Sequence, residues 1–154
     1  MGQLNGSEIL AKALKREGVE ELFFLMGGPM LTAEAATIQE GIRCIDVRHE
    51  QAAAMMAQAY SRLRQKPGFC MAASGPATIN LSTGLANALI DCCPVVALGG
   101  ASPMLGNGKQ VFQEIDQMEI MSGCVKYAAR IYDARRIPEM LNVAIQKAMS
   151  GKPG

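Results

Sequence analysis

The sequence has little of several features that define other classes of protein. It contains no tryptophan and one histidine, and aromatic residues make up 5% of the chain. A metal site built from several histidines is therefore excluded. The net charge is +1 at pH 7, so there is no strong field to attract nucleic acid or an anionic membrane. No apolar stretch has membrane-spanning length, and the first ten residues lack the basic and then apolar pattern of a signal peptide.

The cysteines lack the number and spacing typical of a disulfide framework or a zinc site. They are odd in number, show no CxxC spacing and lie largely within apolar runs: Cys44, Cys70, Cys92, Cys93 and Cys124. Buried free thiols in a reducing compartment explain this pattern better than disulfides or a zinc site. We therefore expect a cytoplasmic protein with no metal site in this chain.

The chain does have enough apolar residues, 49% of 154, for one globular domain with a substantial core. Apolar runs alternate with stretches of helical spacing. Ser7 is the expected N-cap of the first helix, and Gly18 its stop. The expected strands are 22–26, 42–47, 69–73, 94–98 and 125–132. Helices are expected at 31–40, 51–65, 77–90 and 137–149, with a short one inside 112–121.

This alternation predicts an α/β fold, a mainly parallel sheet with helices on both faces. The turns that follow the strands then meet at one edge of the sheet, where open α/β sheets bind ligands. They are Gly27-Gly28-Pro29, His49-Glu50, Ser74-Gly75-Pro76 and Gly99-Gly100. Each glycine-rich turn taken alone is explained by turn geometry. Together, with one acid among them, they favour a crevice for a small molecule.

Glu50 is the acid at that edge, between an apolar strand and a run of helix formers. A carboxylate held in a partly apolar crevice is a candidate for proton transfer. The alternative is that an acid in the first turn of a helix only complements the helix dipole. Dinucleotide and P-loop motifs are absent, Ser74 lacks a GxSxG context, and His49 beside Glu50 makes no triad.

Several motifs, in order, resemble one known family. They are the Gly27-Gly28-Pro29 turn, His49-Glu50 before an alanine-rich helix, Ser74-Gly75-Pro76 with Asn80, the run Phe112 to Gln117, and the closing Ser150 to Gly154. Over nearly its whole length the chain resembles the N-terminal pyrimidine-binding domain of thiamine-diphosphate-dependent enzymes of the acetolactate synthase type. That group includes oxalyl-CoA decarboxylase and 2-hydroxyacyl-CoA lyase. The resemblance implies a lyase, decarboxylase or synthase acting on 2-keto acids or on 2-hydroxyacyl or oxalyl thioesters.

The resemblance also implies roles for individual residues. Glu50 would hydrogen-bond N1′ of the cofactor's aminopyrimidine, so that the 4′-nitrogen can remove the thiazolium C2 proton. The implied cofactor-binding residues are Gly27, Gly28, Pro29, Glu50, Ser74, Pro76 and Asn80, and Phe112 and Gln113 are implied on the substrate side. His49 would either brace the turn or assist catalysis. Glu114 to Met118 leans toward the acyl-CoA members of the group.

Two departures accompany the resemblance. Ala77 stands where the family often has a second glycine, which puts close backbone approach there in doubt. The chain reaches Gly154 without the last strand of the family sheet and without the motif that holds magnesium and the diphosphate. Residues 1–154 are therefore expected to be one domain of a larger enzyme, with Mg²⁺ bound elsewhere.

The family pattern implies a homodimer or homotetramer in which a diphosphate-binding domain, of the same or another subunit, faces this one. The helices at 51–60 and 80–90 are candidate interface surfaces. A non-catalytic regulatory or assembly module with the same fold is the alternative.

Overall fold

Four strands form one parallel sheet in the order β2-β1-β3-β4 in the computed structural model, which describes residues 4–154. The strands are β1 (Glu21–Phe24), β2 (Arg43–Asp46), β3 (Gly68–Ser74) and β4 (Val95–Gly100). The α-helices are α1 (Gly6–Arg16), α2 (Leu31–Gln39), α3 (Glu50–Arg64), α4 (Pro76–Asn80), α5 (Ser82–Ile90), α6 (Gln117–Met121) and α7 (Ile137–Met149). Short 3₁₀ helices are η1 (Gly28–Met30), η2 (Met104–Gly106) and η3 (Ala134–Arg136). The expected α/β class is confirmed.

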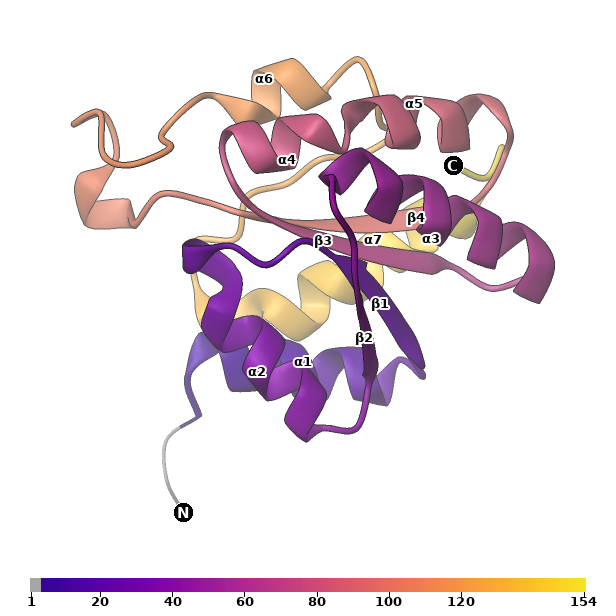
Figure 1. Cartoon of the computed structure of the whole chain (residues 1–154), viewed down its shortest axis with the longest axis horizontal. Helices are drawn as coiled ribbons and strands as arrows, with labels where there is room; N and C mark the ends of the chain where they lie inside the picture. The colour runs from indigo at the N-terminus through magenta and orange to yellow at the C-terminus, as the bar shows by residue number, and fades with distance from the viewer. Residues whose placement is uncertain (1–3) are drawn as a thin grey trace.

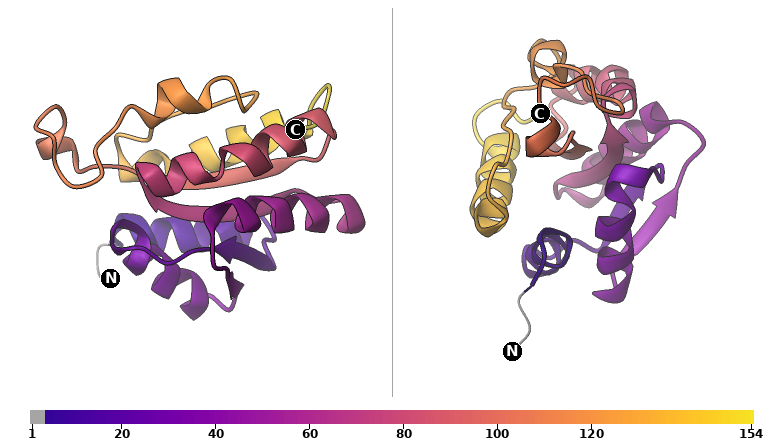
Figure 2. Two further views of the ribbon diagram at one scale, coloured as in Figure 1. Left: turned by 45° about the horizontal axis from the view of Figure 1, so that its top comes forward. Right: turned by 90° about the vertical axis from the view of Figure 1, so that its left-hand side faces the viewer.

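The sheet has a separate core on each face because successive side chains of a strand point to opposite sides. Leu22, Phe24 and Met71 belong to one core, with α1, α2 and α7. Phe23 and Cys70 belong to the other, with α3, α4 and α5. Figures 1 and 2 show α1 and α2 on one side of the sheet and α3, α4 and α5 on the other. Strands buried on both faces explain the continuous apolar runs of the sequence.

Helix boundaries differ from the expected ones at two places. The N-cap of α1 is Asn5, not Ser7: the Asn5 side chain accepts from the Glu8 amide at 3.0 Å, and the Glu8 carboxylate accepts from the Asn5 amide at 2.8 Å. This reciprocal capping box satisfies two backbone donors that Ser7 would leave unpaired. The expected helix over 77–90 is divided at Leu81 into α4 and α5.

The expected fifth strand at 125–132 is wrong. This segment has no sheet partner, and β4 pairs with β3 alone among the described strands. A cavity of about 200 Å³, lined mainly by apolar side chains, lies between β4 and residues 124–131. A strand needs a neighbour for its backbone groups. The apolar pattern of 125–132 is therefore present without the pairing that would make it a strand.

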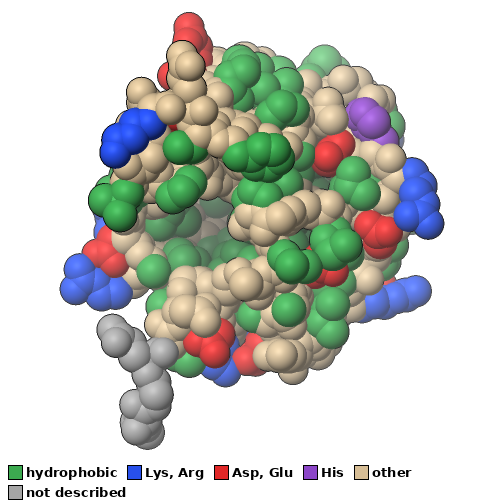
Figure 3. All heavy atoms as spheres, turned by 60° about the vertical axis from the view of Figure 1, so that its left-hand side comes forward, with side chains coloured by type: hydrophobic (Ala, Val, Ile, Leu, Met, Phe, Trp, Pro, Cys, Tyr) green, Lys and Arg blue, Asp and Glu red, His purple; other side chains and the backbone are tan. Residues whose placement is uncertain are grey.

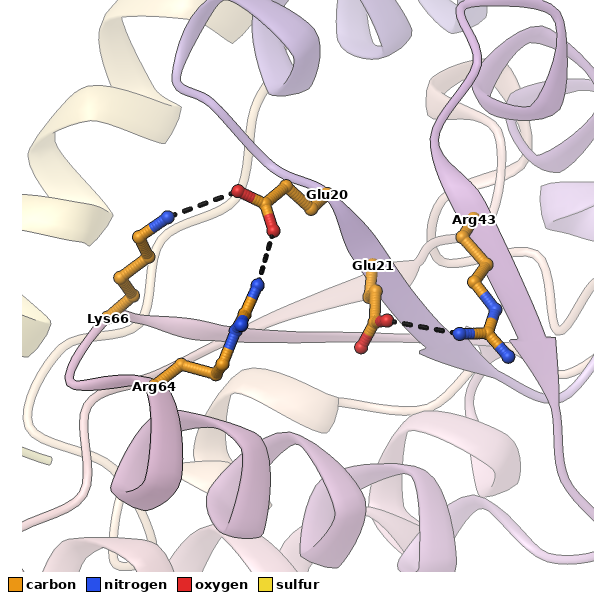
Figure 4. A network of polar contacts seen from close by, with 5 residues as sticks. All are labelled: Glu20, Glu21, Arg43, Arg64 and Lys66. Carbon is orange, nitrogen blue, oxygen red and sulfur yellow. Dashed lines mark hydrogen bonds and ion pairs between the residues drawn. The ribbon is translucent and has the colours of Figure 1, made fainter.

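The amino ends of the strands carry ion pairs. Glu20 accepts hydrogen bonds from Arg64 and Lys66, and Glu21 accepts one from Arg43 (Figure 4). The hydrogen bonds from Lys66 and Arg64 lower the pKa of Glu20. These pairs are exposed, and water screens them, so they contribute little to stability.

Two expectations about the chain as a whole can be compared with the described residues. The five cysteines are free thiols, but the expected burial holds only for Cys70 and Cys93; Cys44 and Cys124 are half-buried, and Cys92 is exposed. Among residues 4–154, no helix is both long and apolar enough to cross a bilayer. The expected absence of a leader pattern at the start of the chain falls partly on residues 1–3, outside the described residues.

Candidate functional site

The carboxyl ends of β1, β3 and β4 meet at one edge of the sheet, as expected, although Gly99 and Gly100 are the last residues of β4 and not a turn after it. Gly27 packs against Ala73 so closely that a Cβ on Gly27 would lie 2.4 Å from the Ala73 Cβ. Gly100 is similarly confined, because its Cβ would lie 2.9 Å from the Ser74 amide nitrogen and 3.2 Å from Met30 Cγ. Glycine is needed at both positions because backbone and side chains approach one another there.

Glu50 is the first residue of α3 and only 8% exposed. The Asn80 side chain, from the end of α4, donates a hydrogen bond from Nδ2 to Glu50 Oε2 at 2.9 Å. No residue between 4 and 154 donates a hydrogen bond to the other carboxylate oxygen, Oε1. The predicted Glu50 and Asn80 are thus brought together, and one oxygen of the acid is left available to a ligand.

His49 has a structural role at the same turn. Its Nδ1 accepts a hydrogen bond from the Gln51 amide at 3.2 Å, so His49 is the N-cap of α3. An N-cap acceptor satisfies an amide that the first helical turn cannot pair. His49 therefore braces the turn that presents Glu50, which is the first of the two roles expected for it.

Ser74 and Gln113 are also brought together. Ser74 is buried at the end of β3, and its hydroxyl lies 3.2 Å from Gln113 Oε1, to which it donates. The backbone of Gln113 passes over Gly75, where an added Cβ would lie 2.2 Å from the Gln113 carbonyl oxygen. The run after β4 is therefore folded back onto the end of β3.

The remaining predicted residues lie around these contacts. Gly28 and Pro29 are exposed within η1, and nothing lies within 4 Å of a Cβ added to Gly28. Pro76 is exposed at the start of α4, and Phe112 is 77% exposed. Ala77 is buried in the core between α3 and α4, so its methyl group does not block the approach to the crevice.

The carboxyl edge is hollowed beside β4. A cavity of about 870 Å³ is bounded by Pro29, Gly100, Gln113, Gln117 and Arg130, among others. Figure 3 turns this side of the molecule forward and shows a hollow bordered by hydrophobic side chains. Glu50 and Asn80 do not line it, so the acid–amide pair and the hollow are separate parts of the edge. The helix α4 connects them, since it begins beside Ser74 and ends at Asn80.

Sequence reasoning placed Gln117 and Glu114 within family motifs but gave neither residue a role of its own. The Gln117 side chain joins β3 to β4: Oε1 accepts from the Gly75 amide at 2.8 Å, and Nε2 donates to the Gly100 carbonyl at 2.7 Å. Glu114 accepts hydrogen bonds from the amides of Gly108 and Val111. The hydrogen bond from Gly108 is the largest of the effects that lower the pKa of Glu114. Their place in the run Phe112 to Gln117 was the available signal.

These features define a class. A parallel α/β domain with a buried acid–amide pair and close glycine turns at its carboxyl edge has the features typical of a small-molecule-binding domain. Across the described part of the chain, no group of three or more metal-ligating side chains is present.

The comparison with protein families gives the particular identity within that class. Residues 4–120 match the family described as the thiamine pyrophosphate enzyme, N-terminal TPP binding domain. The chain belongs to this family. The resemblance drawn from the motifs is confirmed.

Individual relatives agree with this assignment. An acetolactate synthase of Arabidopsis thaliana, chloroplastic by its name, is 39% identical over 150 residues, which are 97% of this chain and 22% of that protein. The acetolactate synthase isozyme 2 large subunit of Escherichia coli is 37% identical over 98% of this chain and 28% of its own length. Human 2-hydroxyacyl-CoA lyase 1 is 36% identical over 99% of this chain and 26% of its own. The chain thus spans about a quarter of the length of these relatives.

Proposed function

We propose that this domain binds the aminopyrimidine ring of thiamine diphosphate at Glu50, within a C–C lyase, decarboxylase or synthase. The observation that carries the proposal is the state of the Glu50 carboxylate. It is buried, one oxygen is held by Asn80, and the other has no partner among the described residues. Oε1 is not among the buried oxygens that lack a partner, so a ligand can reach it, and a ligand N–H that does so gains a charge-assisted hydrogen bond.

The chain's own residues fit such a ring. Asn80 orients the carboxylate, and His49 fixes the helix start from which it projects. The open, exposed turn at Gly28 and Pro29 lets a flat ring approach backbone, and Ser74 and Pro76 border the same edge. When bound, thiamine diphosphate supplies a carbon nucleophile and an electron sink. The role of Glu50 is to hold the proton at the pyrimidine nitrogen.

The substrate is proposed to be a 2-keto acid or a 2-hydroxyacyl or oxalyl thioester. The relatives include acetolactate synthases and 2-hydroxyacyl-CoA lyases, which supports this range of acyl compounds. Phe112 and Gln113 would face the substrate. Phe112 is strongly exposed on a run fixed to the end of β3, a position suited to contact a bound molecule.

The diphosphate and Mg²⁺ are proposed to bind a second domain, of the same or another subunit, in a homodimer or homotetramer. The unpaired edge of β4 supports a larger enzyme, because an exposed strand edge invites pairing. We propose that a further strand of that enzyme lies in the cavity between β4 and residues 124–131. Lys126 donates to the carbonyls of Lys147 and Ser150 at 2.6 and 2.8 Å, which holds the end of α7 beside that cavity. The five free thiols favour a cytoplasmic location.

Glu50→Gln tests the proposal in an enzyme assembled with a diphosphate-binding domain, thiamine diphosphate and Mg²⁺. The amide keeps the shape but cannot hold the proton, so turnover should fall at least about 100-fold. Glu17→Gln, at an exposed site after α1, is the matched control and should leave turnover unchanged. Urea unfolding should show that Glu50→Gln keeps the fold. Near-normal turnover of Glu50→Gln would overturn the assignment, and failure of the wild type to bind cofactor would favour the non-catalytic module.

A further inference from the structure

The side chain of Gln117 connects two neighbouring strand ends. Its Oε1 accepts from the amide of Gly75, the residue after β3, and its Nε2 donates to the carbonyl of Gly100, the last residue of β4. The two hydrogen bonds are short, at 2.8 and 2.7 Å. Both hydrogen-bonding groups of one amide are therefore used at the carboxyl edge of the sheet.

Both backbone groups would otherwise lack a regular partner. Gly75 is the N-cap of α4, where amides have no carbonyl within the helix. Gly100 ends β4, and the ladder to β3 is irregular between Ala72 and Ser74. A side chain that satisfies an amide and a carbonyl at once is specific in its geometry, because a carboxylate or an apolar side chain cannot do both.

The segment just before Gln117 is held in an unusual conformation. Gln113 has a φ of +57°, which side-chain-bearing residues rarely adopt, and its carbonyl rests on Gly75. Such a residue persists only where its surroundings over-determine it. Ser74 fixes the Gln113 side chain on one side, and Gln117 fixes the chain four residues further on.

We infer that Gln117 is a positioning residue that determines where Phe112 and Gln113 stand over the crevice. This inference rests on the proposed function for the substrate-side role of those two residues. Gln117 borders the hollow beside β4, but both hydrogen-bonding groups of its amide are already used by the backbone of the two strand ends. Its amide holds the segment that follows β4 against the ends of β3 and β4. The backbone that carries Phe112 is thereby fixed in place.

The first test uses the 154-residue chain and needs no cofactor. Gln117→Met keeps the length of the side chain and removes both hydrogen bonds, and Gln146→Met, on the exposed side of α7, is the matched control. Hydrogen exchange followed by NMR should show the Gly75 amide exchanging at least about fivefold faster in Gln117→Met alone. Unchanged exchange at Gly75, or equal acceleration throughout the core, would overturn the inference.

A second variant separates hydrogen bonding from bulk. In Gln117→Glu the ionised carboxylate accepts from Gly75 but repels the Gly100 carbonyl, whereas the protonated acid offers one donor and one acceptor, as the amide does. The amide shift of Ala101, the residue after that carbonyl, should therefore return toward the wild-type value as pH falls. Gln117→Met should show no such return. A return in Gln117→Met as well would contradict the role of the amide.

The assembled enzyme tests the functional part. Gln117→Met should raise KM for the carbonyl substrate about fivefold or more, with kcat and the Kd of thiamine diphosphate within twofold of wild type. A merely structural glutamine would change all three together or none, and either result would overturn the positioning role. If the wild type has no cofactor-dependent activity, the proposed function fails, while the exchange result at Gly75 still decides whether Gln117 fixes the loop.

Discussion

Gly75→Ala measures how strongly the loop after β4 is pressed onto the end of β3. Gly75 has φ +59° and ψ −119°, a conformation essentially confined to glycine. Forcing alanine into it costs about 1–3 kcal/mol. The new Cβ would also lie 2.2 Å from the Gln113 carbonyl oxygen, and overpacking of this kind typically costs about 1–3 kcal/mol more. We expect the free energy of unfolding to fall by about 3 kcal/mol.

Gly18→Ala is the matched control for the backbone part of this cost. Gly18 also has a positive φ, +76°, but nothing lies within 4 Å of its added Cβ. It should lose about 1 kcal/mol. Urea unfolding of the two variants, with unchanged dependence on denaturant, therefore leaves about 2 kcal/mol for the contact with Gln113 and the more restricted backbone of Gly75 together. Equal losses in the two variants would refute the reasoning, because the loop would then yield at no cost.

Two further predictions concern titratable groups away from the crevice. Iodoacetamide at pH 8 should modify the exposed Cys92 well before Cys70, because burial raises the pKa of the Cys70 thiol to about 12. Equal rates of modification would contradict the burial of Cys70. Burial, with a smaller effect of Asp46, raises the pKa of Glu34 above its ordinary 4.5. Because the folded state favours the neutral carboxyl of Glu34, this contribution to the free energy of unfolding is full below pH 4.5 and is lost as pH rises through the raised pKa. Glu34→Gln should therefore be more stable than wild type at pH 7, and the two stabilities should approach each other near pH 4. A less stable Glu34→Gln at pH 7 would contradict the cost assigned to the buried, unpaired Oε2.

Local sequence patterns were sufficient to predict most of the sheet. The runs at 22–26 and 69–73 are continuous and apolar because β1 and β3 are central strands buried on both faces. The glycines that follow these strands marked the carboxyl edge correctly, since an added Cβ would lie 2.4 Å from Ala73 Cβ at Gly27 and 2.2 Å from the Gln113 carbonyl oxygen at Gly75. Periodicity and turn chemistry act over a few residues, which is why a single sequence contains this information.

The errors and omissions depend on distant partners. The run at 125–132 has the composition of a strand, but only a hydrogen-bonded neighbour makes it one, and composition does not show whether that neighbour exists. The bond of Gln117 to Gly75 joins residues 42 positions apart. A glutamine at the start of a short helix gives no local sign that its amide will hydrogen-bond two strand ends. The helix is divided at Leu81, where neither glycine nor proline stands, so no helix-breaking residue marked the division in the sequence.

The two edges of the sheet differ in how they use polar groups, and this difference bears on the proposed chemistry. At the amino edge, Glu20 is paired with two cations, which lower its pKa and keep it ionised. At the carboxyl edge, Glu50 is paired with the neutral amide of Asn80, and none of the ion pairs among the described residues includes it. A cation in place of Asn80 would compensate the charge of the carboxylate and compete with a ligand N–H. The neutral donor orients the acid and leaves its charge to attract the proton of a bound ring, which is the arrangement that proton sharing at a pyrimidine nitrogen requires.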